Sequence, residues 1–204
     1  MTLPLVIFLA ATVVPVFFSK IQSIPVWLAV QALALGWSGT SQQAQLSPHV
    51  LVALLEVLVV RGAVAPLLLR RAIRLRIEPN MDLMPSNLFT WATAVALIVL
   101  AFEFGAPAMS DRQAFTLGVV GATVAVALLV LATNNSPPAQ LVAVLFMENA
   151  LALFESLLPE PWPWPVHATL SAIYLLTAGV GSWLVGVREP GEADDPLHAA
   201  EERT

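Results

Sequence analysis

The stretch from Ala139 to Leu158, AQLVAVLFMENALALFESLL, decides the fold of this chain. It is a nearly continuous apolar run with Glu148 and Asn149 near its middle and Glu155 nearer its far end. At about 1.5 Å per helical residue, a run of this length crosses a hydrocarbon core of roughly 30 Å. A charged side chain at the centre of such a span costs about 2.5–3.5 kcal/mol on insertion scales. Packing alone does not require that cost, so we expect Glu148 to face away from lipid.

Glu148 and Glu155 lie seven residues apart, close to two helical turns, and therefore project toward nearly the same face. We predict that Glu148 exchanges protons and that Asn149 is its neutral hydrogen-bonding neighbour. The alternative is a permanently protonated Glu148 that holds helices together. Glu155 has two interpretations as well, either a relay group on the exit side or an interfacial carboxylate that reaches water.

The composition indicates an integral membrane protein. The chain is 58% hydrophobic and only 11% charged, whereas soluble domains carry about 25% charged residues. It has no cysteine, which excludes disulfides, thiolate metal sites and cysteine-ligated iron–sulfur clusters within this chain. No catalytic Ser/His/Asp set, P-loop or Gly-rich dinucleotide fingerprint is present. We therefore expect no catalytic centre and no cofactor in this chain.

The chain contains seven apolar runs of spanning length, and none of them shows the alternation of a strand. We predict an all-α membrane domain over residues 1–187 with about seven transmembrane helices. The acidic residues 188–204 are predicted to be a disordered cytoplasmic tail. The predicted spans are Leu3 to Phe18, Ile24 to about Gly39, Val50 to Leu69, Asn87 to Phe104, Ala114 to Ala132, Ala139 to Leu158, and Val166 to Val187.

The basic residues predict the orientation. If the helices alternate in direction, one side of the membrane receives seven basic residues and the other receives Arg112 alone. Cytoplasmic loops carry the excess of Lys and Arg, so we expect the N-terminus outside and the C-terminus in the cytoplasm. So few clustered cations suit topology and lipid-headgroup or partner contacts better than nucleic-acid binding. The seven residues are Lys20, Arg70, Arg71, Arg74, Arg76, Arg188 and Arg203.

The third apolar run carries two charged residues, Glu56 and Arg61. Five residues correspond to about 140° around an α-helix, so we expect no direct pair between them. Arg61 is always charged and needs an acidic or carbonyl partner from another helix or another subunit. The two residues then belong either to a charged axis through the membrane or to a structural ion pair between helices.

The other polar residues are weaker candidates. Glu103 is expected to be an interfacial anchor. His49 and His167 are expected to be wetted helix-end residues, because no second ligand lies at a metal-site spacing. The seventh run contains no acidic residue, and Tyr174 is its candidate supporting polar group.

Two stretches carry a family resemblance. LVAVLFMENALALFE, which follows an Asn-Asn-Ser turn, and LVALLEVLVVRGAVAPLLLRR both resemble the hydrogenase 4 component E family. Chain length and number of spans agree, so the resemblance covers nearly the whole chain. The last three spans, about residues 114–187, are similar to subunit K of NADH–quinone oxidoreductase and to the corresponding small component of the cation/proton antiporters that are built from several subunits. Those relatives have a buried glutamate in the second of three helices, where Glu148 stands here.

The resemblance implies a non-catalytic membrane subunit of a complex I-like or hydrogenase-type energy-converting complex in a prokaryotic inner membrane. Its implied partners are larger antiporter-like subunits and a redox or hydrogenase module, which would hold iron–sulfur centres and, in a hydrogenase module, nickel–iron centres. Protons or sodium ions would then move along a path through Glu148, with Glu56, Glu155 and Arg61. The second buried glutamate of the subunit K pattern is missing, because the seventh run has no acid. Glu155 or Glu56 is left as the second carboxylate.

Two other classes of protein remain open. In one, the chain is a structural adaptor whose helices fill a gap between larger membrane subunits. In the other, it is an autonomous transporter, although it lacks the paired Gly/Pro-broken spans that mark a substrate site.

Overall fold

The fold is known from a computed structural model. It describes residues 2–18, 20–41, 48–74, 83, 87–105, 111–158 and 162–186. Within these ranges the chain forms helices joined by short connections, and no β-strand is found. The predicted acidic tail, residues 188–204, lies outside the described residues.

The helices follow the apolar runs of the sequence. The third run forms one continuous rod made of α3, a π-helical segment η2 and α4. The elements are α1 (Leu3–Phe18), η1 (Ile21–Ser23), α2 (Ile24–Thr40), α3 (Pro48–Glu56), η2 (Val57–Val64), α4 (Ala65–Arg74), α5 (Leu88–Gly105), α6 (Asp111–Thr133), α7 (Pro137–Phe154), η3 (Glu155–Leu157) and α8 (Trp164–Gly186).

Five helical stretches are long and apolar enough to cross a membrane, and two shorter apolar helices accompany them. The protein is therefore an all-helical, multi-pass membrane protein, which confirms the predicted class. The third helix runs past its predicted end at Leu69 to Arg74, because the arginines there continue the helix. The five long stretches are Ile21–Thr40, Leu51–Arg74, Asp111–Thr133, Pro137–Leu157 and Trp164–Gly186; the two shorter helices are Leu3–Phe18 and Leu88–Phe104.

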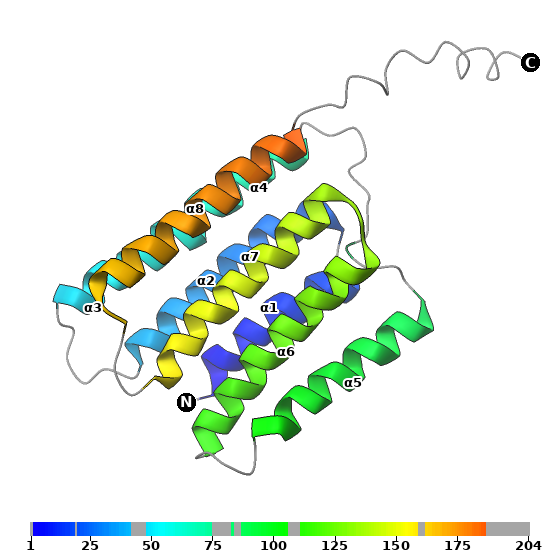
Figure 1. The fold of residues 1–204 in the computed structure, drawn as a ribbon, viewed down its shortest axis with the longest axis horizontal. Helices are drawn as coiled ribbons and strands as arrows, with labels where there is room; N and C mark the ends of the chain where they lie inside the picture. The colour runs from blue at the N-terminus through cyan, green and yellow to red at the C-terminus, as the bar shows by residue number, and fades with distance from the viewer. Residues whose placement is uncertain are drawn as a thin grey trace, which may run out of the picture.

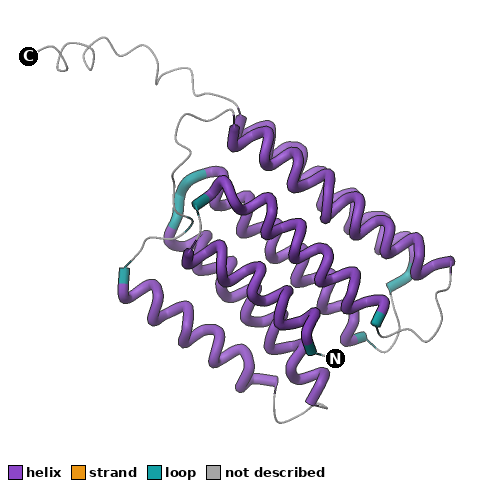
Figure 2. Tube along the Cα trace, turned by 180° about the vertical axis from the view of Figure 1, so that it is seen from behind, coloured by secondary structure: helices purple, strands orange, loops and turns teal. Residues whose placement is uncertain are grey.

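The helices pack side by side in two layers and run in alternating directions (Figure 1). One layer contains α8, α7, α6 and α5, and the second contains the α3–η2–α4 rod, α2 and α1. Figure 2 shows the same arrangement from behind. The rod pairs with α8 at one edge, and α5 packs on α6 at the other. Because of the alternation, Lys20 and the arginines of α4 lie at one end of the bundle and Arg112 at the other.

Small residues allow the helices to approach closely. A Cβ atom added at Gly118 of α6 would collide with the ring of Phe102 of α5, and one added at Gly181 of α8 would collide with Leu141 of α7. Small residues at helix contacts are typical of membrane bundles, where dispersion contacts rather than water exclusion hold helices together.

The outer surface is apolar and the interior contains polar groups. Phe104 of α5 is 84% exposed and Leu176 of α8 is 67% exposed. Such side chains suit contact with lipid. In contrast, Gln31, Arg61 and Asn149 are all buried in the interior of the bundle. Because buried polar groups need partners, these residues locate the candidate site.

Candidate functional site

Arg61 is the centre of a buried polar network between the two layers. It lies in η2 and is 5% exposed. Its Nη1 donates hydrogen bonds to Oδ1 of Asn149, at 3.0 Å, and to the backbone carbonyl oxygen of Glu148, at 3.2 Å. Both acceptors come from α7. The sequence predicted an acidic or carbonyl partner from another helix, and the carbonyl of Glu148 is such a partner.

Glu56 also pairs with Arg61, and the prediction that they do not pair was wrong. Arg61 Nε lies 3.7 Å from Glu56 Oε1. The 140° estimate assumed a regular α-helix, but the segment after Glu56, Val57–Val64, is a π-helix. A π-helix bonds residue i to residue i+5, so its wider turn brings the fifth residue back toward the same face. The π-helical segment therefore creates the intrahelical ion pair.

Three polar residues of α8 complete the surroundings of this pair. Ser171 Oγ donates to Glu56 Oε1 at 2.7 Å, and Thr177 Oγ1 donates to Glu148 Oε1 at 3.0 Å. Between them, the fully buried Tyr174 places its ring 4.3 Å from Cζ of Arg61, within the range of a cation–π contact. Their spacing of three residues places them on one side of α8.

A second branch extends the network through α2 to α1. Asn149 Nδ2 donates to Gln31 Oε1 at 2.8 Å, and Gln31 Nε2 donates to Thr12 Oγ1 at 2.8 Å. All three side chains are fully buried. Sequence reasoning did not place Gln31 and Thr12 in the site. A glutamine inside an otherwise apolar run was the signal that could have identified Gln31.

Glu148 lies where α7 meets α8 and is partly buried. One carboxylate oxygen, Oε1, accepts the Thr177 hydrogen bond. The other, Oε2, is buried and has no hydrogen-bond partner among the described residues. The network thus contains one guanidinium, on Arg61, and two carboxylates, on Glu56 and Glu148. If both carboxylates are ionised the cluster carries a net negative charge, and a single proton makes it neutral.

Glu155 faces α8 as its spacing from Glu148 predicts, but it makes separate contacts. Its Oε1 lies 2.7 Å from Nε2 of His167 and accepts a hydrogen bond from the backbone N–H of Trp162 at 3.0 Å. Seven residues along a helix correspond to about 10 Å. Of the two possible second carboxylates, Glu56 is therefore the one that shares Arg61 with Glu148.

The remaining candidates lie away from this network or outside the description. Glu103 is exposed on α5. The side chain of His49 is outside the described residues. Within the described part of the chain, no group of three His, Cys, Asp or Glu side chains could hold a metal ion.

Comparisons with known proteins found no match among family models, curated proteins or solved structures. The geometry of the network is therefore the basis for a functional proposal.

Proposed function

We propose that this protein is a membrane component of a complex I-like or hydrogenase-type energy-converting assembly of several subunits. In this proposal it contributes an intramembrane carboxylate path along which protons, or sodium ions, are moved. Glu148 exchanges the proton, Glu56 and Arg61 set the charge around it, and Glu155 extends the path toward one end of the bundle. The redox centres belong to partner subunits.

The observation that carries this proposal is the shared guanidinium. Arg61 contacts Glu56 directly and the Glu148 backbone carbonyl, so a proton gained or lost by either carboxylate changes the charge of one connected cluster. A structural ion pair needs only one carboxylate for one guanidinium. The second carboxylate, with a buried oxygen that has no partner among the described residues, suits a group that takes up and releases a proton.

The connections of the cluster favour coupling to neighbouring subunits. The α3–η2–α4 rod and α8 form one edge of the bundle (Figure 1), and Glu56 is 23% exposed there. A charge change in an adjacent subunit would alter the proton occupancy of the cluster through space. We place the end of the bundle with Lys20 and the α4 arginines in the cytoplasm of a prokaryotic cell.

The structural adaptor is the second candidate. The branch from Asn149 through Gln31 to Thr12 favours it, because these neutral groups satisfy one another and join three helices. As an adaptor, the protein would need the same network for assembly but would conduct nothing.

The Glu148→Gln variant separates these functions. The intact complex would be isolated from its native membrane, reconstituted into vesicles and assayed for ion uptake during turnover, with its chains identified by mass spectrometry. We expect an unchanged set of co-purifying chains and an ion uptake at least about tenfold lower, the scale of losing a proton-transfer group. The matched control is Glu103→Gln, which removes an exposed carboxylate of α5 and should leave uptake unchanged.

Other results decide against the proposal. Undiminished uptake in an intact Glu148→Gln complex removes Glu148 from the path. Loss of assembly in Glu148→Gln and in the double variant with Glu56→Gln identifies an adaptor. Isolation of the native protein without partner chains contradicts the proposed membership in a larger assembly and favours an autonomous transporter.

A further inference from the structure

The last two turns of α4 have an unusual surface. Leu67, Arg70, Arg71 and Arg74 line a hollow of about 370 Å³ at the basic end of the bundle. Their positions, i, i+3, i+4 and i+7, lie along one side of the helix. The buried residues of α4, which include Leu69 and Ile73, pack into the core on the other side. The helix therefore cannot turn its arginines away from this surface.

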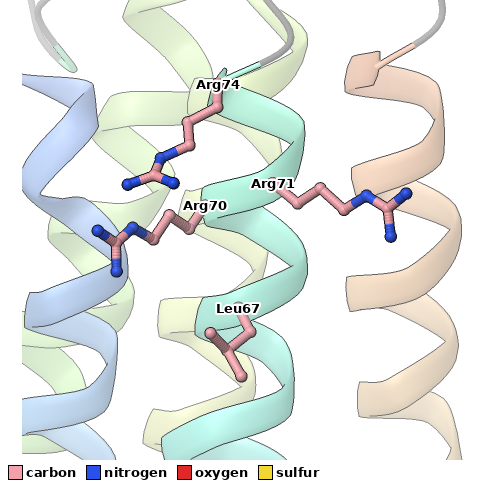
Figure 3. A pocket seen from close by; sticks show the side chains of 4 residues that line it. All are labelled: Leu67, Arg70, Arg71 and Arg74. Carbon is pink, nitrogen blue, oxygen red and sulfur yellow. The ribbon is translucent and has the colours of Figure 1, made fainter.

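The three guanidinium groups have no acidic partner among the described residues. Arg70, Arg71 and Arg74 are exposed, and none of them forms an ion pair with a residue that the structure describes. Figure 3 shows Arg70 and Arg74 reaching to one side of the helix and Arg71 to the other, with Leu67 between them and a turn deeper. Three like charges on two turns repel one another unless an anion lies between them.

The order of groups along α4 identifies the kind of anion. Leu67 is 62% exposed and lies on the side of the hollow nearer the middle of the span, whereas the arginines lie toward the end of the helix. A ligand that fills the hollow must therefore be apolar at one end and negatively charged at the other. Guanidinium groups bind phosphate through paired, parallel hydrogen bonds.

We propose that this hollow is a binding site for an anionic phospholipid. The phosphate lies among Arg70, Arg71 and Arg74, and an acyl chain runs along Leu67 toward the centre of the membrane. The site is separate from the Arg61 network and does not depend on its function.

The test is a lipid titration of the full chain. Delipidated protein in detergent would be titrated with dioleoylphosphatidylglycerol or dioleoylphosphatidylcholine, and bound lipid would be counted by native mass spectrometry. The two lipids have the same acyl chains, so only the headgroup differs. We expect the anionic lipid to bind at least about tenfold more tightly, and the preference to disappear in the Arg70→Gln/Arg71→Gln/Arg74→Gln variant. Arg112→Gln, an exposed arginine at the other end of the bundle, is the matched control and should keep the preference.

Further arms keep the test decisive if the triple variant does not fold. Arg70→Lys/Arg71→Lys/Arg74→Lys keeps every charge but cannot form the paired hydrogen bonds, so we expect it to bind the anionic lipid several-fold more weakly. Leu67→Gln should also weaken lipid binding, because it removes the acyl contact without changing charge. The proposal is overturned by equal binding of the two lipids, by unchanged preference in the folded triple variants, or by displacement of the lipid with equimolar inorganic phosphate. Protection of these arginines by a co-purifying acidic protein instead of lipid would overturn it as well.

Discussion

Glu56 and Arg61 form an ion pair across five residues of one helix, with Arg61 Nε 3.7 Å from Glu56 Oε1. The pair exists because the segment between them belongs to the π-helix Val57–Val64. In a regular α-helix, residues four apart share a face and residues five apart do not. The geometry of the pair thus depends on one local departure from α-helical hydrogen bonding.

Two single-residue deletions test this dependence. Val59 and Ala63 are both exposed in the π-helical segment, and removing either residue should restore a regular α-helix. Deletion of Val59 shortens the spacing to four residues and preserves the pair, whereas deletion of Ala63 keeps the spacing at five and separates the charges. We expect the Ala63 deletion to be less stable by about 3–5 kcal/mol, the scale of breaking a buried pair. The measurement is reversible unfolding in mixed detergent micelles, and equal losses in the two deletions would contradict it.

The pair should also show coupling in a double-mutant cycle. Arg61→Met removes the cation that pairs with Glu56 and leaves its carboxylate uncompensated, so we expect a loss of about 3–5 kcal/mol of unfolding free energy. The double variant Glu56→Gln/Arg61→Met removes both charges and should recover most of that loss. Additive losses of the two single substitutions in the same unfolding assay would show that the residues act independently.

Asn149 should be needed for both branches of the network. It accepts a hydrogen bond from Arg61 and donates one to Gln31, so Asn149→Leu leaves groups on two other helices without a partner. We expect it to lower the unfolding free energy by about 1–3 kcal/mol. Asn149→Asp keeps the acceptor for Arg61 but loses the donor to Gln31, so its loss should be smaller. Thr169→Ala is the control, since its exposed hydroxyl bonds to the backbone of its own helix; a comparable loss there would remove the special role of Asn149.

Much of the fold could be predicted because hydropathy and length determine which segments span a membrane. The apolar runs, the helical class and the shared face of Glu148 and Glu155 all follow from composition and helical periodicity. The π-helix does not, because the residues Val57 to Val64 are ordinary helix formers in lipid and only the packing of the rod shows the departure. Its absence from the prediction is what made the Glu56–Arg61 estimate wrong.

The site was predicted in its charged members and missed in its neutral ones. A charge within an apolar run is costly and therefore conspicuous, which is why Glu56, Arg61 and Glu148 could be selected. Gln31 and Thr12 are neutral and cost little in a span, so their part in the network depends on which helices are neighbours. Sequence periodicity gives the face of a helix but not the partner that this face meets.

The packing of α5 on α6 gives a last prediction, independent of the network. A Cβ atom at Gly118 would collide with the Phe102 ring, so Gly118→Ala should force the two helices apart. We expect a loss of about 1–3 kcal/mol, the usual cost of overpacking, in the same unfolding assay. Phe102→Leu should relieve part of that loss in the double variant, because it removes the ring that causes the collision. The matched control is Gly179→Ala on α8, where a Cβ meets nothing within 4 Å. Because alanine favours helix over glycine by about 1 kcal/mol, this control should be neutral or stabilising, and equal losses at Gly118 and Gly179 would contradict the close approach of α5 and α6.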